Sequence, residues 1–294
     1  LRWAGEHACA VGDAVLRTHR LRHPVNYFQH IGPEACAQIH AILAAQTADS
    51  VDLREARRRD SIVSYTPDAP APAVAELTLG LILSLLRFVH VSNLQMHRGA
   101  WHRFFGRRLS EITLGIIGVG RIGSRVIRFM DRFGPPRILA NDLKPDKKFL
   151  PELNIEWTEK EQIYKKADVI SLHVQLTHLT QNMIQREQLE MMKPDAILIN
   201  TSRGGIVNEQ DLYEILQSNH LSGAAIDVFE KEPYDGPLCE LENCILTAHM
   251  GSMSVDCRTR MEVEATEEVV RYFNGEPLEG VVPEDEYAMQ ANSK

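Results

Sequence analysis

The sequence predicts an α/β fold in which a doubly wound parallel sheet carries helices on both faces. Two observations predict it. From residue 112 to about residue 248, short apolar runs alternate with helix-like segments, and a glycine-rich turn at residues 118–123 joins the first apolar run to the first of these segments. Alternation of this kind is typical of strands joined by crossover helices, and such strands pair in parallel.

The part of the chain before this region has a mostly helical pattern. Asp49 or Ser50 can cap a helix that ends at Arg59, because either side chain can accept a hydrogen bond from the first free backbone N–H groups. No strand is expected within residues 1–50. The elements expected here are helices at residues 8–16, 35–45, 50–59 and 71–91, a strand at 62–65 and a loop at 66–70.

In the alternating region, each apolar run is short enough to be a buried strand. The expected strands are residues 112–117, 138–141, 168–173, 196–200, 223–227 and 244–247, and the expected helices between them are 124–133, 158–165, 186–191 and 209–218. Asn208 is a suitable N-cap for the last of these helices. A final helix over residues 253–273 is expected to end at Asn274-Gly275, and the tail after Glu284 is expected to be disordered.

The glycine-rich turn reads Gly118-Val119-Gly120-Arg121-Ile122-Gly123. In such a pattern the first glycine allows a tight turn, the second lets the backbone approach a pyrophosphate, and the third lets the helix pack on the strand. The next apolar run ends at Asp142, and an acidic residue about 20 positions after the glycines can accept hydrogen bonds from the ribose hydroxyls of NAD. The pattern therefore predicts a dinucleotide site. Asp142 favours NAD because it would repel a 2′-phosphate, whereas Lys144 keeps NADP open.

Three ionisable residues follow three of the expected strands: Arg203, Glu232 and His249. Ligands of doubly wound sheets bind beyond the carboxyl ends of the strands, so these side chains are expected to surround one pocket. Reduction of a 2-keto acid adds a hydride to the carbon and a proton to the oxygen. His249 can donate that proton, Glu232 can orient the imidazole and favour its charged form, and Arg203 can hold the substrate carboxylate or its carbonyl oxygen.

Composition argues against several other classes of protein. The chain has 294 residues, enough for two domains, and its net charge of −8 argues against a nucleic-acid surface. Its five cysteines form no C-x-x-C pair, which argues against a disulfide framework or a metal site and favours a reducing compartment such as the cytoplasm. The longest apolar run, residues 77–86, is too short to span a membrane. The chain begins with Leu1, so a targeting segment upstream stays open.

Taken together, the motifs resemble those of the D-isomer-specific 2-hydroxyacid dehydrogenases. The resemblance rests on the glycine turn, on Asp142 and on residues 200–204, 227–233 and 247–252, which read Asn-Thr-Ser-Arg-Gly, Asp-Val-Phe-Glu-Lys-Glu-Pro and Thr-Ala-His-Met-Gly-Ser. It covers about residues 50–275. It implies an NAD-dependent oxidoreductase in which Arg203, Glu232 and His249 are the catalytic residues.

The resemblance also implies the domain organisation and the cofactor contacts. It implies a Rossmann-type NAD-binding domain over residues 76–265. It further implies a smaller, discontinuous, flavodoxin-like substrate domain, shortened at its start, made of residues 1–75 and 266–294. The residues expected at the cofactor are Gly118, Gly120, Arg121, Ile122, Gly123, Asp142, His173, Thr177, Thr201, Ser202, Arg203, Asp227, His249 and Gly251. Of these, His173 is expected to form part of the pocket wall rather than to act in catalysis.

Members of this family pair into homodimers through an arm that residues 93–108 resemble. This segment contains Trp101, Phe104 and Phe105. Burial of these rings between two subunits is the favoured interpretation, and a platform for a ligand is the alternative.

Within the family, residues 64–70 and 232–238 are most similar to phosphoglycerate dehydrogenases, which implies 3-phosphoglycerate as substrate. A hydroxypyruvate or glyoxylate reductase remains an alternative. Family members also carry a glycine-rich loop that holds the substrate carboxylate, and this chain has no glycine in the corresponding residues 44–50. A non-catalytic NAD(H)-binding regulatory protein, or an inactive fragment, is therefore a further alternative.

Overall fold

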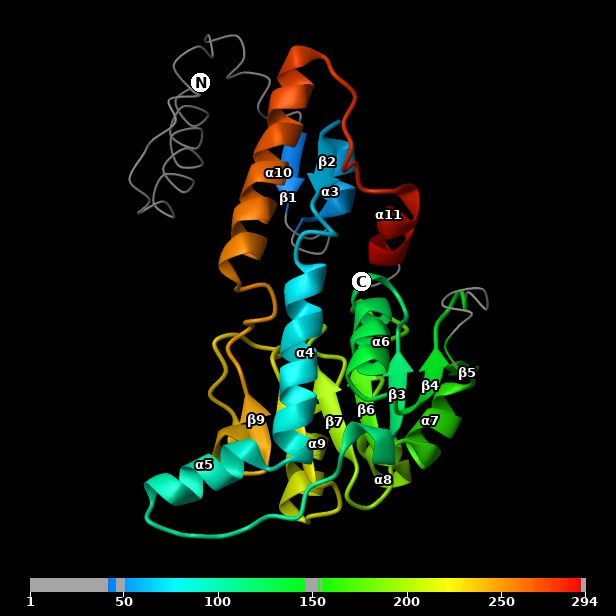
Figure 1. The fold of residues 1–294 in the computed structure, drawn as a ribbon. Coiled ribbons are helices and arrows are strands. Elements are labelled where there is room, and N and C mark those ends of the chain that lie inside the picture. Colours follow the sequence, from blue (N-terminus) through cyan, green and yellow to red (C-terminus); the bar gives the residue numbers. More distant parts are fainter. Residues whose placement is uncertain (1–41, 46–50, 146–152, 154, 292–294) are drawn as a thin grey trace. The chain divides into compact units, whose positions relative to one another are not determined.

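The computed structural model describes residues 42–45, 51–145, 153 and 155–291 (Figure 1). These residues divide into two compact units. Unit 1 contains the described residues up to Pro67 together with Met261–Ala291, and unit 2 contains Asp68–Arg260. The domain boundaries expected from the sequence, after residues 75 and 265, lie a few residues further along the chain at both places.

Unit 2 is built around a seven-stranded sheet in which every strand pair is parallel, in the order β5-β4-β3-β6-β7-β8-β9. The chain adds strands in one direction from β3 and then returns to build the sheet in the other direction from β6. The strands are β3 (Thr113–Ile117), β4 (Arg137–Asn141), β5 (Ile155–Trp157), β6 (Val169–Leu172), β7 (Ile197–Asn200), β8 (Gly223–Ile226) and β9 (Cys244–Leu246). The predicted doubly wound α/β fold is confirmed, and ligands of such sheets bind where the strand order reverses.

Helices cover both faces of this sheet, because successive side chains along each strand point to opposite faces. Leu114 and Ile116 of β3 pack with one set of helices, whereas Ile170 of β6 and Leu198 of β7 pack with the other set. The first face is covered by α4 (Ala71–Leu86) and α6 (Arg121–Phe133), and the second by α7 (Lys160–Lys166), α8 (Arg186–Met191) and α9 (Glu209–Gln217). The remaining elements of this unit are α5 (Val89–His97), η4 (Leu109–Glu111), η5 (Pro237–Glu240) and the first residues of α10 (Val255–Asn274).

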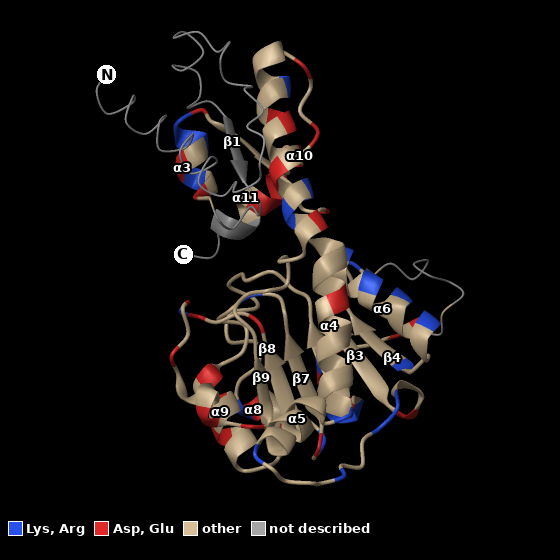
Figure 2. Ribbon diagram, turned by 60° about the vertical axis from the view of Figure 1, so that its left-hand side comes forward, with Lys and Arg blue, Asp and Glu red and all other residues tan. Residues whose placement is uncertain are grey.

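Helix α6 is strongly amphipathic, which fixes its orientation on the sheet. Val126, Ile127 and Met130 are fully buried. Basic residues occur at 121, 125, 128 and 132, where the side chains are exposed or half-buried, and basic residues are the blue segments of α6 in Figure 2. The burial of this face holds the first turn of α6 next to the glycine turn that precedes it.

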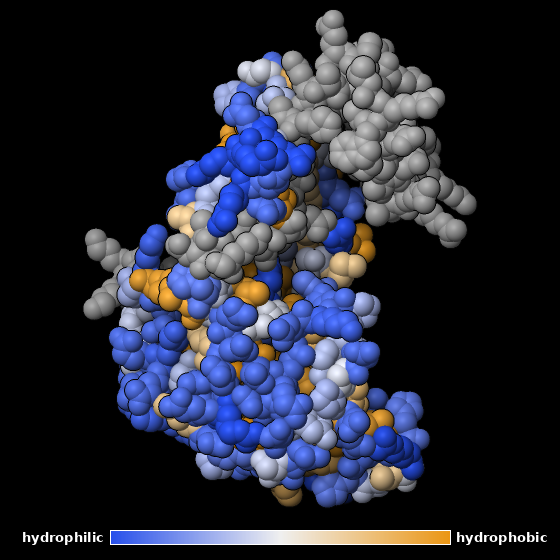
Figure 3. Space-filling model, turned by 180° about the vertical axis from the view of Figure 1, so that it is seen from behind, coloured by the Kyte–Doolittle hydropathy of each residue, from blue (hydrophilic) through white to orange (hydrophobic). Residues whose placement is uncertain are grey.

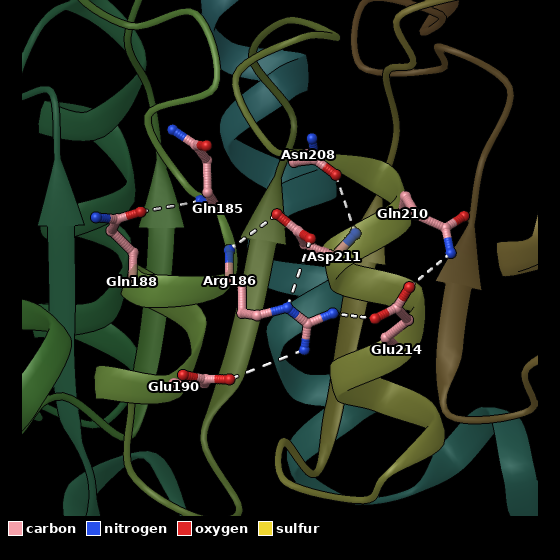
Figure 4. Close-up of polar contacts among 8 residues, drawn as sticks. All are labelled: Gln185, Arg186, Gln188, Glu190, Asn208, Gln210, Asp211 and Glu214. Carbon is pink, nitrogen blue, oxygen red and sulfur yellow. Dashed lines mark hydrogen bonds and ion pairs between the residues drawn. The ribbon is translucent and has the colours of Figure 1, made fainter.

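A network of polar side chains ties α8 to α9 (Figure 4). The backbone N–H of Arg186 donates to Asp211 at 3.0 Å, and the Arg186 guanidinium donates to Glu214 and lies 3.8 Å from Glu190. Asn208 caps α9, as predicted, by accepting from the N–H of Asp211 at 2.9 Å. The start of α9 is thereby fixed in place, and this start contacts the site described below.

Unit 1 contains a two-stranded parallel sheet, formed by β1 (Ile42–Ala45) and β2 (Ile62–Tyr65). Helix α3 (Leu53–Arg58) joins the two strands, and Leu53, Ala56, Val63 and Val282 form a small core. The later part of α10 and α11 (Glu284–Ala291) complete the unit. Asp52 caps α3 by accepting from the N–H of Glu55 at 3.0 Å.

The buried carboxylate of Glu268 connects three segments of unit 1. It is 5% exposed and accepts hydrogen bonds from the Ser64 hydroxyl at 2.6 Å and from the backbone N–H groups of Glu279 and Gly280, both at 3.0 Å. Burial on its own raises the pKa of Glu268, but these hydrogen bonds and the charge of Arg271 lower the pKa below its ordinary value. The ionised carboxylate therefore stabilises this unit.

We expect Glu268→Ala to lower the free energy of unfolding by about 2 to 4 kcal/mol at pH 7, because the buried Ser64 hydroxyl and two partly buried N–H groups lose a charged acceptor. Folding lowers the pKa of Glu268, so its contribution is complete above the ordinary pKa of 4.5 and is lost as the pH falls through the lower folded value. Urea unfolding at pH 7 and near pH 3 tests both points. Glu267→Ala, at an exposed position of the same helix, is the control; an equal effect of the two substitutions would contradict the assignment.

Several predicted elements are corrected. Residues 42–45 are a strand and not the end of a helix, because they pair with β2; the rest of that predicted helix, the one at 8–16 and the proposed caps Asp49 and Ser50 lie outside the described residues. The predicted helix at 71–91 ends at Leu86, since Phe88 adopts a left-handed conformation (φ 53°) before α5 begins. Strand β5 was not predicted. Helix α11 occupies residues expected to be disordered.

Among the described residues, no single helix is long and apolar enough to cross a membrane. Helices α4 and α5 pass that test only as a pair bent by 64°, and half of the residues of α4 are buried against the sheet and its neighbours. On the face drawn in Figure 3, hydrophilic residues predominate and hydrophobic ones are scattered among them.

Candidate active site

The glycine turn after β3 has the geometry of a phosphate cradle. Gly118 has a φ of 95°, which favours glycine, and a Cβ on Gly123 would lie 2.1 Å from the Gly118 carbonyl oxygen. A Cβ on Gly120 would meet nothing within 4 Å, so the space in front of this residue is open. Gly120 is the N-cap of α6 and provides no side-chain cap, which leaves N–H groups of the first turn available to an anion. These features fit the pyrophosphate of a dinucleotide.

Asp142 lies beside this cradle at the end of β4. One of its carboxylate oxygens accepts from the N–H of Val119 at 2.7 Å, and the other accepts from the N–H of Lys144 at 2.9 Å. The carboxylate is thus bound to the glycine turn itself. Arg121, at the first position of α6, pairs with Asp68 at 3.1 Å, while Ile122 packs against the core under the helix.

His173 and Thr177 lie on the chain that follows β6. A Cβ on Gly118 would lie 2.4 Å from the His173 carbonyl oxygen, so His173 borders the glycine turn. Burial lowers the pKa of His173 to about 3, and its Nε2 lies 2.9 Å from the Ser171 hydroxyl. The imidazole is therefore neutral at pH 7, in agreement with a wall residue. The Thr177 hydroxyl accepts from the N–H of Leu179 at 3.2 Å within its own turn.

His249 and Glu232 come together at the carboxyl end of the sheet. His249 Nδ1 lies 2.9 Å from Glu232 Oε2, and Glu232 Oε1 accepts from the N–H of Phe229 at 3.0 Å. About half of the His249 side chain (49%) is exposed, so its other ring nitrogen can reach a ligand. Burial alone raises the pKa of Glu232, but hydrogen bonds from His249 and Phe229 and the charges of His249 and Arg203 lower it overall. Glu232 is therefore an ionised partner for the imidazole.

The loop that carries Glu232 is held from α9 and from the turn after β7. Glu209, the first residue of α9, accepts from the N–H of Glu230 at 2.8 Å. Gly204 lies so close that a Cβ there would be 1.9 Å from the Phe229 carbonyl oxygen. Only glycine fits at this position, and the close approach brings the turn of Arg203 next to the loop that leads to Glu232, whose pKa the charge of Arg203 helps to lower.

Asn200 organises the turn that carries Arg203. Its side-chain oxygen accepts from the N–H and the hydroxyl of Ser202, at 3.1 and 2.7 Å, and its amide donates to the Arg203 carbonyl at 3.0 Å. Asn200 was not among the predicted functional residues. An Asn directly after an apolar strand and before Thr-Ser-Arg-Gly is the available signal, because Asn side chains commonly bond to their own turns.

Asp227 holds the loop of His249, a role that was not predicted from the sequence. It is 1% exposed and accepts three hydrogen bonds: from the Thr247 hydroxyl at 2.6 Å and from the N–H groups of Met250 and Gly251 at 2.7 and 2.8 Å. These bonds hold the loop in which His249 adopts a left-handed conformation (φ 50°). Left-handed residues other than glycine are uncommon and occur often at functional sites. Asp227 thus positions His249 through the backbone.

The order of the strands places the phosphate cradle at a distance from the pair of His249 and Glu232. The cradle follows β3, Arg203 follows β7, two strands away, and His249 follows β9, four strands away. Adjacent strands lie about 4.8 Å apart, so the two ends of this edge are roughly 19 Å apart. An extended dinucleotide would suit this span if its phosphates bound at β3 and its nicotinamide end lay towards β7 to β9. No group of three or more His, Cys, Asp or Glu residues suited to a metal occurs in the described part of the chain.

Comparison with known proteins agrees with this arrangement. Residues 79–251 match the family model described as D-isomer specific 2-hydroxyacid dehydrogenase, NAD binding domain. The chain is 38% identical over 238 residues to a D-3-phosphoglycerate dehydrogenase of Methanocaldococcus jannaschii; the match covers 80% of this chain but only 45% of that relative. It is 38% identical over 236 residues to a glyoxylate reductase of Korarchaeum cryptofilum, covering 78% and 71% of the two chains.

A solved structure has the same fold. The D-lactate dehydrogenase of Aquifex aeolicus, complexed with NAD and lactic acid, superimposes with a TM-score of 0.74 at 28% identity, covering 84% of this chain and 81% of that chain. The family match, the parallel sheet with its glycine turn and the pairing of His249 with Glu232 lead to one conclusion. The chain belongs to the D-isomer-specific 2-hydroxyacid dehydrogenases, and residues 79–251 are its NAD-binding domain.

Proposed function

We propose that this protein transfers a hydride between NAD and a D-2-hydroxy acid or the corresponding 2-keto acid, and that its substrate is 3-phosphoglycerate. The observation that carries the proposal is the contact of 2.9 Å between His249 and Glu232, beside Arg203, on the same sheet edge as the phosphate cradle. The phosphoglycerate dehydrogenase among its relatives favours this substrate. The glyoxylate reductase among them favours the second candidate, reduction of glyoxylate or hydroxypyruvate.

In this proposal, each residue of the pocket acts at a defined atom. Glu232 accepts from His249 Nδ1, which directs Nε2 towards the substrate oxygen. Nε2 removes the hydroxyl proton when the hydroxy acid is oxidised and returns it when the keto acid is reduced. The guanidinium of Arg203 binds the substrate carboxylate, because its planar fork matches that group. Bound NAD supplies the hydride acceptor, and NADH the donor.

The substrate test follows nicotinamide absorbance with a small panel. The panel contains 3-phosphoglycerate with NAD, and hydroxypyruvate, glyoxylate and pyruvate with NADH. Turnover of 3-phosphoglycerate supports the first proposal, and turnover only of glyoxylate or hydroxypyruvate supports the second. If no substrate of the panel is turned over while NADH still binds, both substrate proposals are overturned and a dinucleotide-binding protein without catalysis is favoured.

The proposal also covers which parts of the chain form each domain and the cellular compartment of the protein. Residues 1–75 and 266–294 form the substrate domain, and residues 76–265 form the cofactor domain. The protein acts in the cytoplasm, which is supported by the sequence, because its five cysteines form no C-x-x-C pair and suit a reducing compartment. Limited proteolysis followed by NADH titration of the fragments tests the first point, since a fragment that retains residues 76–265 should keep its affinity.

Asp142 should determine the choice between NAD and NADP. We expect Asp142→Ala to weaken NAD binding about tenfold, because a charged acceptor for ribose hydroxyls is worth about one hydrogen bond. Binding of NADP should weaken less or improve, since the charge that repels its 2′-phosphate is gone. Titration of both dinucleotides measures the ratio. Lys144→Ala should change the ratio in the opposite direction, and an unchanged ratio in Asp142→Ala would place the ribose elsewhere.

The proposal also includes a homodimer formed through the segment around α5. Large apolar side chains are exposed there: Trp101 is 77% exposed, Phe105 98%, Val89 54% and Met96 50%. No residue of α5 is buried. Apolar side chains gathered on one segment are typical of a surface covered by a partner. A second copy fits because the family dimerises through the segment that residues 93–108 resemble.

Replacement of Trp101 and Phe105 by serine should therefore dissociate the dimer. Light scattering should give twice the chain mass of 33.2 kDa for the unmodified protein and the chain mass for the double variant. Phe133→Ser, at a residue that is 65% exposed outside the arm, should leave the mass unchanged. A monomeric unmodified protein at micromolar concentration would argue against the dimer.

A further inference from the structure

A buried pair of hydroxyl groups joins α4 to the turn after β7. The Thr78 hydroxyl lies 2.8 Å from the Val74 carbonyl oxygen and 2.9 Å from the Thr201 hydroxyl. Thr78 is fully buried and Thr201 is 5% exposed. Among the described residues, the Thr201 hydroxyl has no other hydrogen-bond partner. This contact connects a helix in the core to a residue at the carboxyl edge of the sheet.

The chemistry of hydroxyl groups fixes the direction of the bond between the two threonines. A hydroxyl has one proton to donate and two lone pairs that accept. Threonine in a helix commonly donates to the carbonyl four residues earlier, which is the contact between Thr78 and Val74. Thr78 then has no proton left for Thr201, so Thr201 must donate to Thr78. The Thr201 oxygen consequently presents only lone pairs to a third partner.

The surroundings of Thr201 also present acceptors. Both carboxylate oxygens of Asp227 accept, and the N–H groups nearest to them, on Met250 and Gly251, are already donated to Asp227. Val74 closes the same corner, since a Cβ on Gly251 would lie 3.1 Å from its Cγ2. A ligand group that contacts this corner therefore has to be a donor.

We propose that Thr78 is a positioning residue that fixes the Thr201 hydroxyl as an acceptor for the amide NH₂ of the nicotinamide carboxamide. The inference rests on the proposed function, which puts the nicotinamide end of the cofactor between β7 and β9. On the nicotinamide group itself, the carboxamide NH₂ is the one hydrogen-bond donor, and the donors on the adjoining ribose are also present in ADP-ribose. Thr78 touches neither substrate nor cofactor, and it acts only through the proton of Thr201.

The test compares NADH with its reduced 3-acetylpyridine analogue, in which a methyl ketone replaces the amide. The ketone can accept a hydrogen bond but cannot donate one. Dissociation constants are measured by fluorescence or calorimetry, without turnover. The unmodified protein should bind NADH about tenfold more tightly than the analogue, the effect of one hydrogen bond.

Thr78→Val keeps the shape of the side chain but removes the acceptor of the Thr201 proton. That proton then turns towards the ligand, where it opposes an NH₂ group and suits a ketone. We expect NADH to bind about tenfold more weakly and the analogue to bind as well as before or better, so the preference disappears. Thr78→Ser retains the hydroxyl and should retain the preference. ADP-ribose, which lacks the nicotinamide, should bind equally to all variants.

Other outcomes overturn the inference. If Thr78→Val weakens NADH and the analogue by the same factor, Thr78 has only a packing role. If the preference persists, Thr201 does not accept from the amide. Should Thr78→Val fail to fold, Thr201→Val must abolish the preference for the inference to stand. An unmodified protein that binds neither NADH nor ADP-ribose would remove the proposed function itself, whereas binding with an unchanged ratio removes this inference alone.

Discussion

Replacement of His249 by glutamine should lower kcat by about three orders of magnitude while NADH binding is retained. General acid–base catalysis by a positioned side chain is typically worth 10²- to 10⁴-fold, and His249 is the group that the proposed reaction uses for its proton. Glutamine is similar in size and still forms hydrogen bonds, but it cannot exchange a proton at neutral pH. The loss should therefore appear in kcat and leave the dissociation constant of NADH nearly unchanged.

Glu232→Gln should have a smaller effect of the same kind. Glu232 Oε2 accepts from His249 Nδ1, and the lowered pKa of Glu232 keeps the carboxylate ionised at neutral pH. An amide at this position still accepts one hydrogen bond but removes the charge that stabilises a protonated imidazole. We expect a loss in kcat of about ten- to a hundredfold, which corresponds to about 1.4 to 2.8 kcal/mol.

His178→Gln is the matched control for both substitutions. His178 is an exposed histidine of the same unit and has no part in the proposed proton transfer. Its replacement should leave kcat and NADH binding unchanged. Stopped-flow measurement of a single turnover separates the chemical step from product release. If the chemical step of His249→Gln stays within a factor of a few of the unmodified rate, His249 is not the proton donor.

The sheet could be predicted from the sequence because its strands are buried on both faces. Residues 196–199 and 223–226 are continuous apolar or small runs, and such runs bounded by turn residues mark strands in parallel sheets. Strand β5 was not predicted because Ile155–Trp157 has only three residues and none of their side chains is fully buried. A strand of that length is formed by pairing with β4 and not by its own sequence pattern.

Strand β1 shows a direct conflict between local preference and tertiary structure. Residues 35–45 contain five alanines, and alanine has the highest helix propensity, so a helix was the natural prediction. Residues 42–45 instead pair in parallel with Ile62–Tyr65. Differences of a few tenths of a kcal/mol per residue between helix and strand propensity are smaller than the gain from strand pairing and burial. The partner strand lies elsewhere in the chain, so the local sequence pattern does not indicate it.

The same limit applies to the candidate site. Arg203, Glu232 and His249 could be selected because each follows a predicted strand, and parallel strands place their carboxyl ends on one edge. The residues that hold them were not selected. Asp227 was predicted at the cofactor, but its hydrogen bonds to the loop of His249 were not predicted. Thr78 lies in a helix, 123 residues before its partner Thr201. Contacts of that kind follow from the packed fold and not from a motif.

The glycine turn allows the sharpest separation of fold from function, because two of its glycines are needed for different reasons. A Cβ on Gly123 would lie 2.1 Å from the Gly118 carbonyl oxygen, which is backbone and cannot move aside easily. Gly123→Ala should therefore lower the free energy of unfolding by about 1 to 3 kcal/mol, the usual cost of forcing an extra methyl group into a packed position. Dinucleotide binding should fall as well, since the turn itself must shift.

Gly120→Ala, in contrast, should not lower the free energy of unfolding appreciably. Its Cβ would meet no atom of the protein within 4 Å, and its φ of −79° and ψ of −151° lie at the edge of the extended region, so the stability of the variant should be close to that of the unmodified protein. The open space is where the pyrophosphate of the dinucleotide should lie. A methyl group there should weaken NADH binding about a hundredfold, equivalent to about 2.8 kcal/mol.

Gly80→Ala completes the comparison, because Gly80 is an exposed residue within α4 whose Cβ would also meet nothing within 4 Å. It should raise the free energy of unfolding by up to about 1 kcal/mol through helix propensity, and NADH binding should not change. Urea unfolding and NADH titration of the three variants are the measurements. A loss of affinity without a loss of stability in Gly120→Ala identifies space kept for a ligand. If Gly120→Ala binds NADH as well as Gly80→Ala does, the pyrophosphate does not lie against Gly120, and the position assigned to the cofactor along the sheet edge is wrong.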